Sequence, residues 1–295
     1  MCSKLTSFSI IISVYNTPIK YINECLNSIL NQEEYKSELE IVVWDDGSSL
    51  SYKKELSKLV STYNLNIKYD GSIENQGLAK ARNHAINIST GEWLIILDSD
   101  DFLANNSLKL IEDYIFLNPE YDFIYSNHIY ISENGKDIIY IREKSIYQYY
   151  HALYKGTIID PLLSSTYIFH CQIFRRRLFN ELKGFDETIS SGEEVDFHIR
   201  ASNLSKKINI GHLDENIYYY RKNLNSVCHD ETYYKQLIDN IEKILLKHTN
   251  KIYNIKRVYK VGRSINTYTA HYKLIDINEK EVSIPWFDYK ELKVI

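Results

Sequence analysis

The sequence predicts an α/β fold whose core is a largely parallel sheet with helices on both faces. In the first third of the chain, short apolar runs rich in β-branched residues alternate with patterns of helical period. Each run stops at turn residues, as buried strands do. Two clusters of aspartates directly follow two of these runs, and ligands of such sheets bind beyond the carboxyl ends of the strands. We therefore expect a ligand site at that edge.

The first strand and helix are predicted within residues 7–30. The run SFSIIISVY (7–15) is rich in β-branched residues and too short to span a membrane. Thr17 is expected to be the N-cap of a helix and Pro18 its first residue. Apolar residues then recur at helical spacing as far as Leu30.

The alternation continues as far as the second acidic cluster. Further elements are predicted as a strand at 39–44, a helix at 50–63, a strand at 65–69, a helix at 77–88 and a strand at 92–97. Strands joined through helices pair in parallel, because the crossover returns the chain to the same end of the sheet. These strands are therefore expected to form one parallel sheet.

Beyond residue 103 the pattern changes. The expected elements are a helix capped by Asn106, a hairpin that turns at Asn134-Gly135, helices at 145–154 and 192–201 and, after residue 230, an amphipathic helix. We predict one mixed sheet with flanking helices, made of two halves at 1–105 and 106–230. A helical C-terminal extension is expected at 231–295.

Composition and charge narrow the class of protein. The 295 residues carry a formal charge of -4, which argues against a nucleic-acid binder, because phosphate contacts need a basic face. The 4 cysteines lie far apart without a CxxC pair, so neither a zinc knuckle nor a disulfide framework is predicted. The sequence shows no long apolar run and no signal-peptide pattern. We therefore expect a cytoplasmic protein.

The segment WLIILDSDDFL carries three carboxylates, Asp98, Asp100 and Asp101, to the end of a predicted strand. Carboxylates packed this closely repel one another unless a cation or hydrogen bonds stabilise them. Such oxygen ligands suit Mg²⁺ or Mn²⁺, which also bind substrate phosphates. A solvated turn with helix-capping aspartates is the alternative interpretation.

Two further segments are predicted near the same edge. Asp45 and Asp46 would accept hydrogen bonds from a nucleobase or ribose, or simply form an Asp–Gly turn. Gly77 opens a helix with Lys80 and Arg82 in its first turns, which offers N–H groups and cations to an anionic ligand. Ordinary capping with surface charges is the alternative for that helix.

The order of six segments resembles the family 2 inverting glycosyltransferases, which have the GT-A fold. The matching segments are SIIISVYN (9–16), EIVVWDDGSS (40–49), ENQGLAKARN (74–83), GEWLIILDSDDFL (91–103), ELKGFDETI (181–189) and GEEVDFHIRA (192–201). The resemblance covers residues 7–228. It implies a nucleotide-sugar-binding half at 1–105 and an acceptor-binding half at 106–230.

The resemblance implies a pocket for the base of a UDP-sugar. Asp46 corresponds to the carboxylate that reads the uracil, and Asp45 precedes it in the same turn. Ser13 and Tyr15, at the end of the first strand, are expected to line the same pocket.

The resemblance also implies a diphosphate site. Asp98 is expected near the ribose and the metal, and Asp100 is expected to bind the Mn²⁺ or Mg²⁺ that bridges the diphosphate. The other candidate contacts are Ser99, Lys80 and Arg82 for the donor, His229 for the metal or diphosphate, and His170 for the acceptor pocket.

The general base is expected in the segment GEEVDF. Glu194 occupies its place, but this chain has Glu193-Glu194 where the family usually has Glu-Asp. Either glutamate is therefore a candidate. One base opposite the leaving group gives a single displacement with inversion, whereas retaining hydrolases need two close carboxylates.

The expected partners are a UDP-sugar donor and a glycan or lipid-linked glycan acceptor of bacterial surface polysaccharide synthesis. Residues 243–273 carry eight Lys or Arg and no Asp or Glu, which suggests contact with the anionic inner membrane leaflet. A solvated basic face or a homodimer contact is the alternative.

Two other functions compete with this interpretation. A sugar-nucleotide nucleotidyltransferase would need a glycine-rich loop after the first strand, and SVYNTPIK contains no glycine. A non-catalytic carbohydrate-binding protein would keep the fold without the chemistry. The complete set of acidic residues argues against that second alternative.

Overall fold

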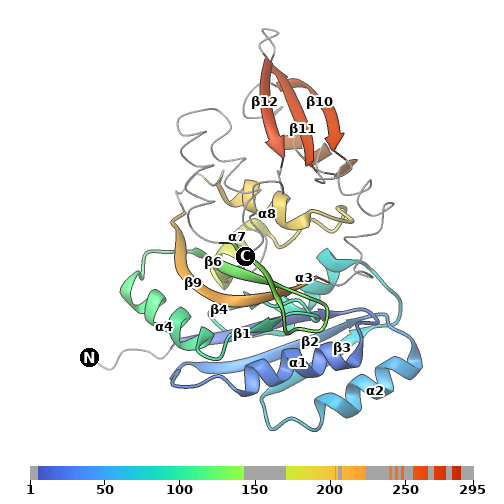
Figure 1. Ribbon diagram of the computed structural model, residues 1–295, viewed down its shortest axis with the longest axis vertical. Coiled ribbons are helices and arrows are strands. Elements are labelled where there is room, and N and C mark those ends of the chain that lie inside the picture. Colours follow the sequence, from blue (N-terminus) through green and yellow to red (C-terminus); the bar gives the residue numbers. More distant parts are fainter. Residues whose placement is uncertain are drawn as a thin grey trace.

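The computed structural model describes residues 6–142, 171–202, 204, 208–222, 239–240, 243–244, 247–248, 255–264, 269–276 and 281–286. Within these residues the main body is a 9-stranded sheet with helices on both faces (Figure 1). Its strand order is β3-β2-β1-β4-β8-β6-β9-β5, and β7 pairs with β6. The mixed sheet with flanking helices that the sequence predicts is confirmed.

The parallel half of the sheet contains the predicted strands. They are β1 (Ser7–Val14), β2 (Glu38–Asp46), β3 (Ile67–Ser72) and β4 (Trp93–Ile96), all paired in parallel. In β1, β2 and β4 the side chains are buried on both faces of the sheet, which is why these sequences read as nearly continuous apolar runs, whereas the edge strand β3 is half-buried or exposed. Because the strands are parallel, their carboxyl ends lie at one edge.

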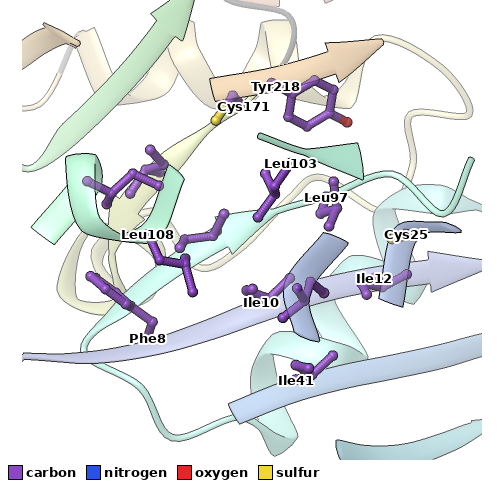
Figure 2. Close-up of a cluster of buried hydrophobic side chains, with 14 of the residues drawn as sticks. Phe8, Ile10, Ile12, Cys25, Ile41, Leu97, Leu103, Leu108, Cys171 and Tyr218 are labelled. Atoms are coloured by element: carbon purple, nitrogen blue, oxygen red, sulfur yellow. The ribbon is translucent and has the colours of Figure 1, made fainter. Parts of the chain in front are cut away.

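Among the described residues, three helices pack against each face of the sheet. The first face packs against α1 (Ile19–Leu30), α2 (Leu50–Val60) and α4 (Ser107–Leu117). The second packs against α3 (Leu78–Ile88), α7 (Arg176–Leu182) and α8 (Glu193–Ser202). Figure 2 shows the core of the first face, where Ile10 and Ile12 lie near Leu97 and Leu103. The alternate residue Ile11 is buried in the core of the second face.

The first helix begins one residue later than predicted. Pro18 is the N-cap, with ψ 126°, and Ile19 is the first helical residue. The hydroxyl of Thr17 instead shares a hydrogen bond of 2.8 Å with that of Ser99. The predicted cap side chain therefore connects this loop to the second acidic cluster.

The second half of the sheet is largely antiparallel. β6 (Phe123–Ile131) and β7 (Ile138–Arg142) form the predicted hairpin around Asn134-Gly135. β8 (Ile173–Arg175) lies between β4 and β6, and β9 (Ile210–Arg221) pairs with β6 in parallel and with β5 (Phe102–Leu103) in antiparallel orientation. β9 was not predicted from the sequence. Its last residues, Tyr218 to Arg221, lie beside the second acidic cluster.

The expected helical extension is only partly correct. Residues 239–240, 243–244 and 247–248 are helical, but β10 (Ile255–Ser264), β11 (Thr269–Asp276) and β12 (Glu281–Trp286) form a separate antiparallel sheet. This stretch is rich in Ile, Val, Tyr and Thr, which favour pleated backbone, whereas the prediction had extended the helical pattern that begins after residue 230. The helix expected at 145–154 lies outside the described residues. No helix in the described part of the chain is long and apolar enough to cross a bilayer.

Candidate active site

Both acidic clusters lie at the carboxyl edge of the parallel strands, as predicted. Asp45 and Asp46 end β2, and Asp98 to Asp101 follow β4. The two clusters are separated in the sheet only by β1, which pairs with both β2 and β4. The residues that the sequence assigns to the donor site are thus gathered at one edge.

The carboxylate of Asp46 organises the loop between β3 and α3. It accepts hydrogen bonds from Ser72 Oγ (3.1 Å), Asn75 Nδ2 (2.9 Å), Gln76 N (3.0 Å) and Gly77 N (2.8 Å). An ionised carboxylate has about four acceptor positions, so this loop fills them. Contact with a uracil stays a prediction, and it would require one of these bonds to be exchanged.

The turn after Asp46 requires a glycine. Gly47 has φ +80°, and a Cβ there would lie 2.1 Å from the carbonyl carbon of Glu74. No L side chain fits at this distance, so the β3–α3 loop can pass this close to the turn only because residue 47 is a glycine.

Asp45 points to the opposite face of the sheet from Asp46. Its Oδ1 accepts a hydrogen bond of 2.8 Å from Ser48 N, and burial together with its charge raises the pKa of Tyr69 to about 12. Ser13 Oγ is buried and has no hydrogen-bond partner among the described residues, while Tyr15 is 54% exposed. A ligand beyond the end of β1 would therefore meet the open ring of Tyr15, whereas the Ser13 hydroxyl is covered in this structure.

Asp101 is a structural anchor of the second cluster. It is 1% exposed, and its carboxylate accepts hydrogen bonds from Tyr218 Oη (2.7 Å) and Arg221 N (2.7 Å). Burial, followed by the charges of Asp100 and Asp98, raises its pKa well above the ordinary value. Both oxygens thus face β9 rather than a ligand.

Arg221 fixes the backbone of the same turn. Its Nε donates to the carbonyl oxygen of Asp100 at 2.8 Å, and one Nη donates to the carbonyl oxygen of Glu133 at 2.8 Å. Glu24 forms an ion pair with the buried guanidinium, which also lies 4.4 Å over the ring of Tyr21. Sequence reasoning missed Arg221; the run of isoleucine and tyrosines in NIYYYR was the available signal for its strand.

Asp98 and Asp100 are the carboxylates of the cluster that remain partly exposed. Burial, followed by the charge of Asp98, raises the pKa of Asp100 to about 6, and a nearby cation would oppose that effect. Hard oxygen donors of this kind fit Mg²⁺ or Mn²⁺. The described residues contain no group of three His, Cys, Asp or Glu able to hold a metal by themselves, and the predicted candidate His229 lies outside them.

Arg82 connects the second acidic cluster to α8. Its guanidinium donates to Asp98 Oδ1 at 3.0 Å and to Glu193 Oε1 at 2.7 Å, and it lies 3.9 Å from Glu194 Oε2. The side chain is only 8% exposed. The sequence predicts that Arg82 contacts an anionic ligand. In the structure its guanidinium is instead bound to the carboxylates of Asp98 and Glu193. Lys80 is half-buried in the first turn of α3.

The two glutamates at the start of α8 differ in their surroundings. The side chain of Glu193 is 2% exposed and bound to Arg82, whereas that of Glu194 is 21% exposed. Burial and the charge of Glu193, opposed by Arg82, raise the pKa of Glu194 to about 8. A partly accessible carboxylate of raised pKa has the properties of a general base. The predicted candidates His229 and His170 lie outside the described residues.

A family model described as "Glycosyl transferase family 2" matches residues 9–183. The minor teichoic acid biosynthesis protein GgaA of Bacillus subtilis is 31% identical over 223 residues, which are 73% of this chain and 47% of that protein. The poly(ribitol-phosphate) beta-N-acetylglucosaminyltransferase TarS of Staphylococcus aureus is 27% identical over 224 residues, which are 73% of this chain and 35% of TarS. The chain therefore spans about half or less of the length of these curated relatives.

Solved structures share the fold. The crystal structure of S. aureus TarS 1-349 with UDP-GlcNAc aligns with a TM-score of 0.58 and 24% identity, covering 82% of this chain and 67% of that one. A mannosyltransferase from Pyrobaculum calidifontis, solved with GDP-Man and Mn²⁺, aligns with a TM-score of 0.54 and 18% identity, covering 84% and 64%. The GT-A type of mixed sheet expected from the sequence is confirmed.

Proposed function

The chain belongs to glycosyl transferase family 2, and from this premise we propose that it is a metal-dependent inverting glycosyltransferase. It transfers a sugar from a UDP-sugar to a hydroxyl of a glycan or lipid-linked glycan in bacterial surface polysaccharide synthesis. The names of GgaA and TarS, and the TarS complexes with UDP and UDP-GlcNAc, support this class of donor and acceptor. We keep 1–105 as the donor-binding half and 106–230 as the acceptor-binding half.

The observation that carries the proposal is the position of Arg82 between Asp98 and the glutamate pair. One buried guanidinium contacts Asp98 at 3.0 Å and Glu193 at 2.7 Å. A transferase needs its leaving-group site and its base on opposite sides of one reacting carbon. Arg82 holds these two sites at a fixed separation.

The donor diphosphate is assigned to the edge formed by Asp98 and Asp100. These carboxylates would hold a divalent cation, which would neutralise the charge of the departing UDP. Arg221 and Asp101 keep the turn rigid from behind, through the carbonyl of Asp100 and the amide of Arg221. Ser13 and Tyr15 are assigned to the base pocket beyond β1.

Glu194 is assigned as the base. Its carboxylate accepts the proton of the acceptor hydroxyl as that oxygen bonds to the anomeric carbon and the bond to UDP breaks. Glu193 is assigned to position Arg82, because it is buried and its Oε1 is already bound to that guanidinium. A single in-line displacement of this kind inverts the anomeric configuration.

Competing functions make different predictions. A nucleotidyltransferase would bind a nucleoside triphosphate with a sugar phosphate, whereas a binding protein would recognise glycans without a nucleotide. The membrane contact of residues 243–273 also stays a prediction, and co-sedimentation with anionic vesicles measures it. Equal sedimentation with neutral and anionic vesicles would contradict that contact.

The proposal is tested by thermal unfolding with a panel of UDP-sugars, with and without Mn²⁺. At least one UDP-sugar should raise the Tm in a metal-dependent way, and Asp100→Ala should abolish the effect. Asp113→Ala is the matched control, because Asp113 lies exposed on α4 with a side-chain exposure of 53%. The proposal fails if no nucleotide sugar binds with or without metal, or if only a triphosphate does.

A further inference from the structure

The helical residues Asn240, Lys247 and His248 contact both sides of the turn that begins α8. We propose that these three residues, which we name the C-terminal clamp, position the glutamate pair for catalysis. The inference rests on the proposed role of that pair, and it assigns a function to a segment beyond residues 9–183, the match to the family model.

On one side, the clamp holds the residues that precede the glutamates. Asn240 Nδ2 donates to Ser190 Oγ at 2.9 Å and to Ser191 Oγ at 3.0 Å. Gly192 follows with φ +80°, a conformation that L side chains rarely adopt. The amide of Asn240 therefore fixes the chain immediately before this glycine turn.

On the other side, the clamp holds Asp196, which lies two residues after Glu194 on α8. The Asp196 side chain is 0% exposed and accepts hydrogen bonds from His248 Nε2 (2.7 Å), Lys247 Nζ (2.9 Å) and Arg200 Nε (2.6 Å). A buried carboxylate needs such partners, because burial without them is costly. Two of these three partners come from the clamp.

Two further contacts keep the clamp itself in place. Lys247 also binds Asp186 Oδ2 at 2.7 Å, so one ammonium joins the loop before the glycine turn to α8. Ile244, between the clamp residues, is 2% exposed. The clamp thus brackets the glutamates with polar contacts and is anchored by a buried apolar side chain.

The Glu194 side chain is held within the first turn of α8, where it hydrogen-bonds with the side chain of the neighbouring Glu193 and with its own backbone. The guanidinium of Arg82 lies 3.9 Å from Glu194 Oε2, beyond hydrogen-bond distance. The direction of the carboxylate is therefore set by the first turn of α8, which the clamp holds from both ends. A displacement of about 1 Å at a reacting group can lower a rate about a hundredfold.

The test compares the double variant Lys247→Ala/His248→Ala with two controls. Lys243→Ala removes an exposed lysine of the same helical segment, and Lys247→Arg/His248→Gln keeps hydrogen-bond donors at both clamp positions. We measure kcat and the KM for the UDP-sugar, the Tm, and hydrogen–deuterium exchange of the amides of residues 193–197.

The double alanine variant should lose about tenfold to a hundredfold in kcat, while the donor KM stays within about twofold. Exchange at 193–197 should become faster, exchange in α1 should not change, and both controls should behave like the unmodified protein. An unchanged kcat in a folded double variant would overturn the proposal, and so would equal loss of kcat in the Arg/Gln variant.

The exchange measurement separates failure of the clamp from failure of the proposed function. If the unmodified protein transfers no sugar, the proposed function fails. Unchanged exchange at 193–197 in the double alanine variant overturns the clamp whatever the activity.

Discussion

The contact between Arg82 and Glu193 gives the sharpest stability prediction. Arg82→Met keeps most of the apolar stem and removes the cation, so Glu193 stays buried with 2% of its side chain exposed and without its ion-pair partner. Breaking one side of a buried ion pair costs about 3–5 kcal/mol. Asp98 adds little to this cost, because its side chain is 34% exposed and solvent screens its charge. We expect a loss of about 3 kcal/mol in the free energy of unfolding.

The assay is urea unfolding at pH 7 in a double-mutant cycle with Glu193→Gln. A neutral glutamine does not need the cation, so the double variant should lose about 2 kcal/mol less than the sum of the losses in the two single variants. This difference is the coupling energy. Arg177→Met is the matched control: its side chain is 67% exposed and pairs with Asp122, so its loss should cost less than about 1 kcal/mol.

Two results would refute this reasoning. One is a cost of Arg82→Met no larger than that of Arg177→Met. The other is a coupling energy near zero between Arg82 and Glu193, since the predicted stabilisation comes from that pair.

Three further predictions concern the pKa of Glu194, the pKa of Glu40 and the hydrogen bond between Tyr218 and Asp101. Because transfer needs the ionised base, kcat/KM should rise with pH through the Glu194 pKa of about 8, and a flat profile would exclude it as the base. Burial raises the Glu40 pKa, but hydrogen bonds from Lys68, Ser9 and Thr90 outweigh burial and lower it from 4.5 to about 2. The lowered pKa stabilises the fold above pH 4.5, and this stabilisation disappears as the pH falls toward 2. Glu40→Gln should therefore lower the free energy of unfolding by about 3 kcal/mol at pH 7 and by little at pH 2. An equal loss at both pH values would contradict this prediction. Tyr218→Phe removes the 2.7 Å bond to Asp101 and should cost about 1–3 kcal/mol in urea unfolding, whereas no loss would show that β9 does not support the turn.

The parallel half of the fold is predictable because three of its strands, β1, β2 and β4, are buried on both faces. β1 contributes Ile10 and Ile12 to one core and Ile11 to the other, so its apolar run has no gaps. The acidic clusters follow such runs, and parallel pairing then places Asp46 and Asp98 at the same edge. Local sequence is sufficient for that part of the site.

The contacts between site residues that lie far apart in the sequence cannot be predicted in this way. Arg82 and Glu193 are 111 residues apart, and Arg221 and Asp100 are 121 apart, so no local pattern relates them. β9 mixes charged residues with tyrosines and therefore lacks the continuous apolar run of β1. The sequence identified Arg82 as a cation near the donor, but only the fold shows that it binds Glu193.

The extension after residue 230 shows a different limit. The prediction extended the amphipathic helical pattern that begins after residue 230 to the whole segment 231–295, whereas β10 to β12 form a sheet. A helical period in one stretch says little about the backbone of the residues that follow it. Ile, Val, Tyr and Thr in β10 to β12 were the better indicator.

Donor binding and sugar transfer, measured side by side in Glu194→Gln and Glu193→Gln, test the central claim most directly. Glu194→Gln should bind the UDP-sugar with a Kd within about twofold of that of the unmodified protein. Its rate of sugar transfer should be at least about a hundredfold lower. Glu193→Gln should retain more of the transfer rate, because Glu193 positions Arg82 and does not accept the proton. Unchanged turnover in Glu194→Gln would contradict the account.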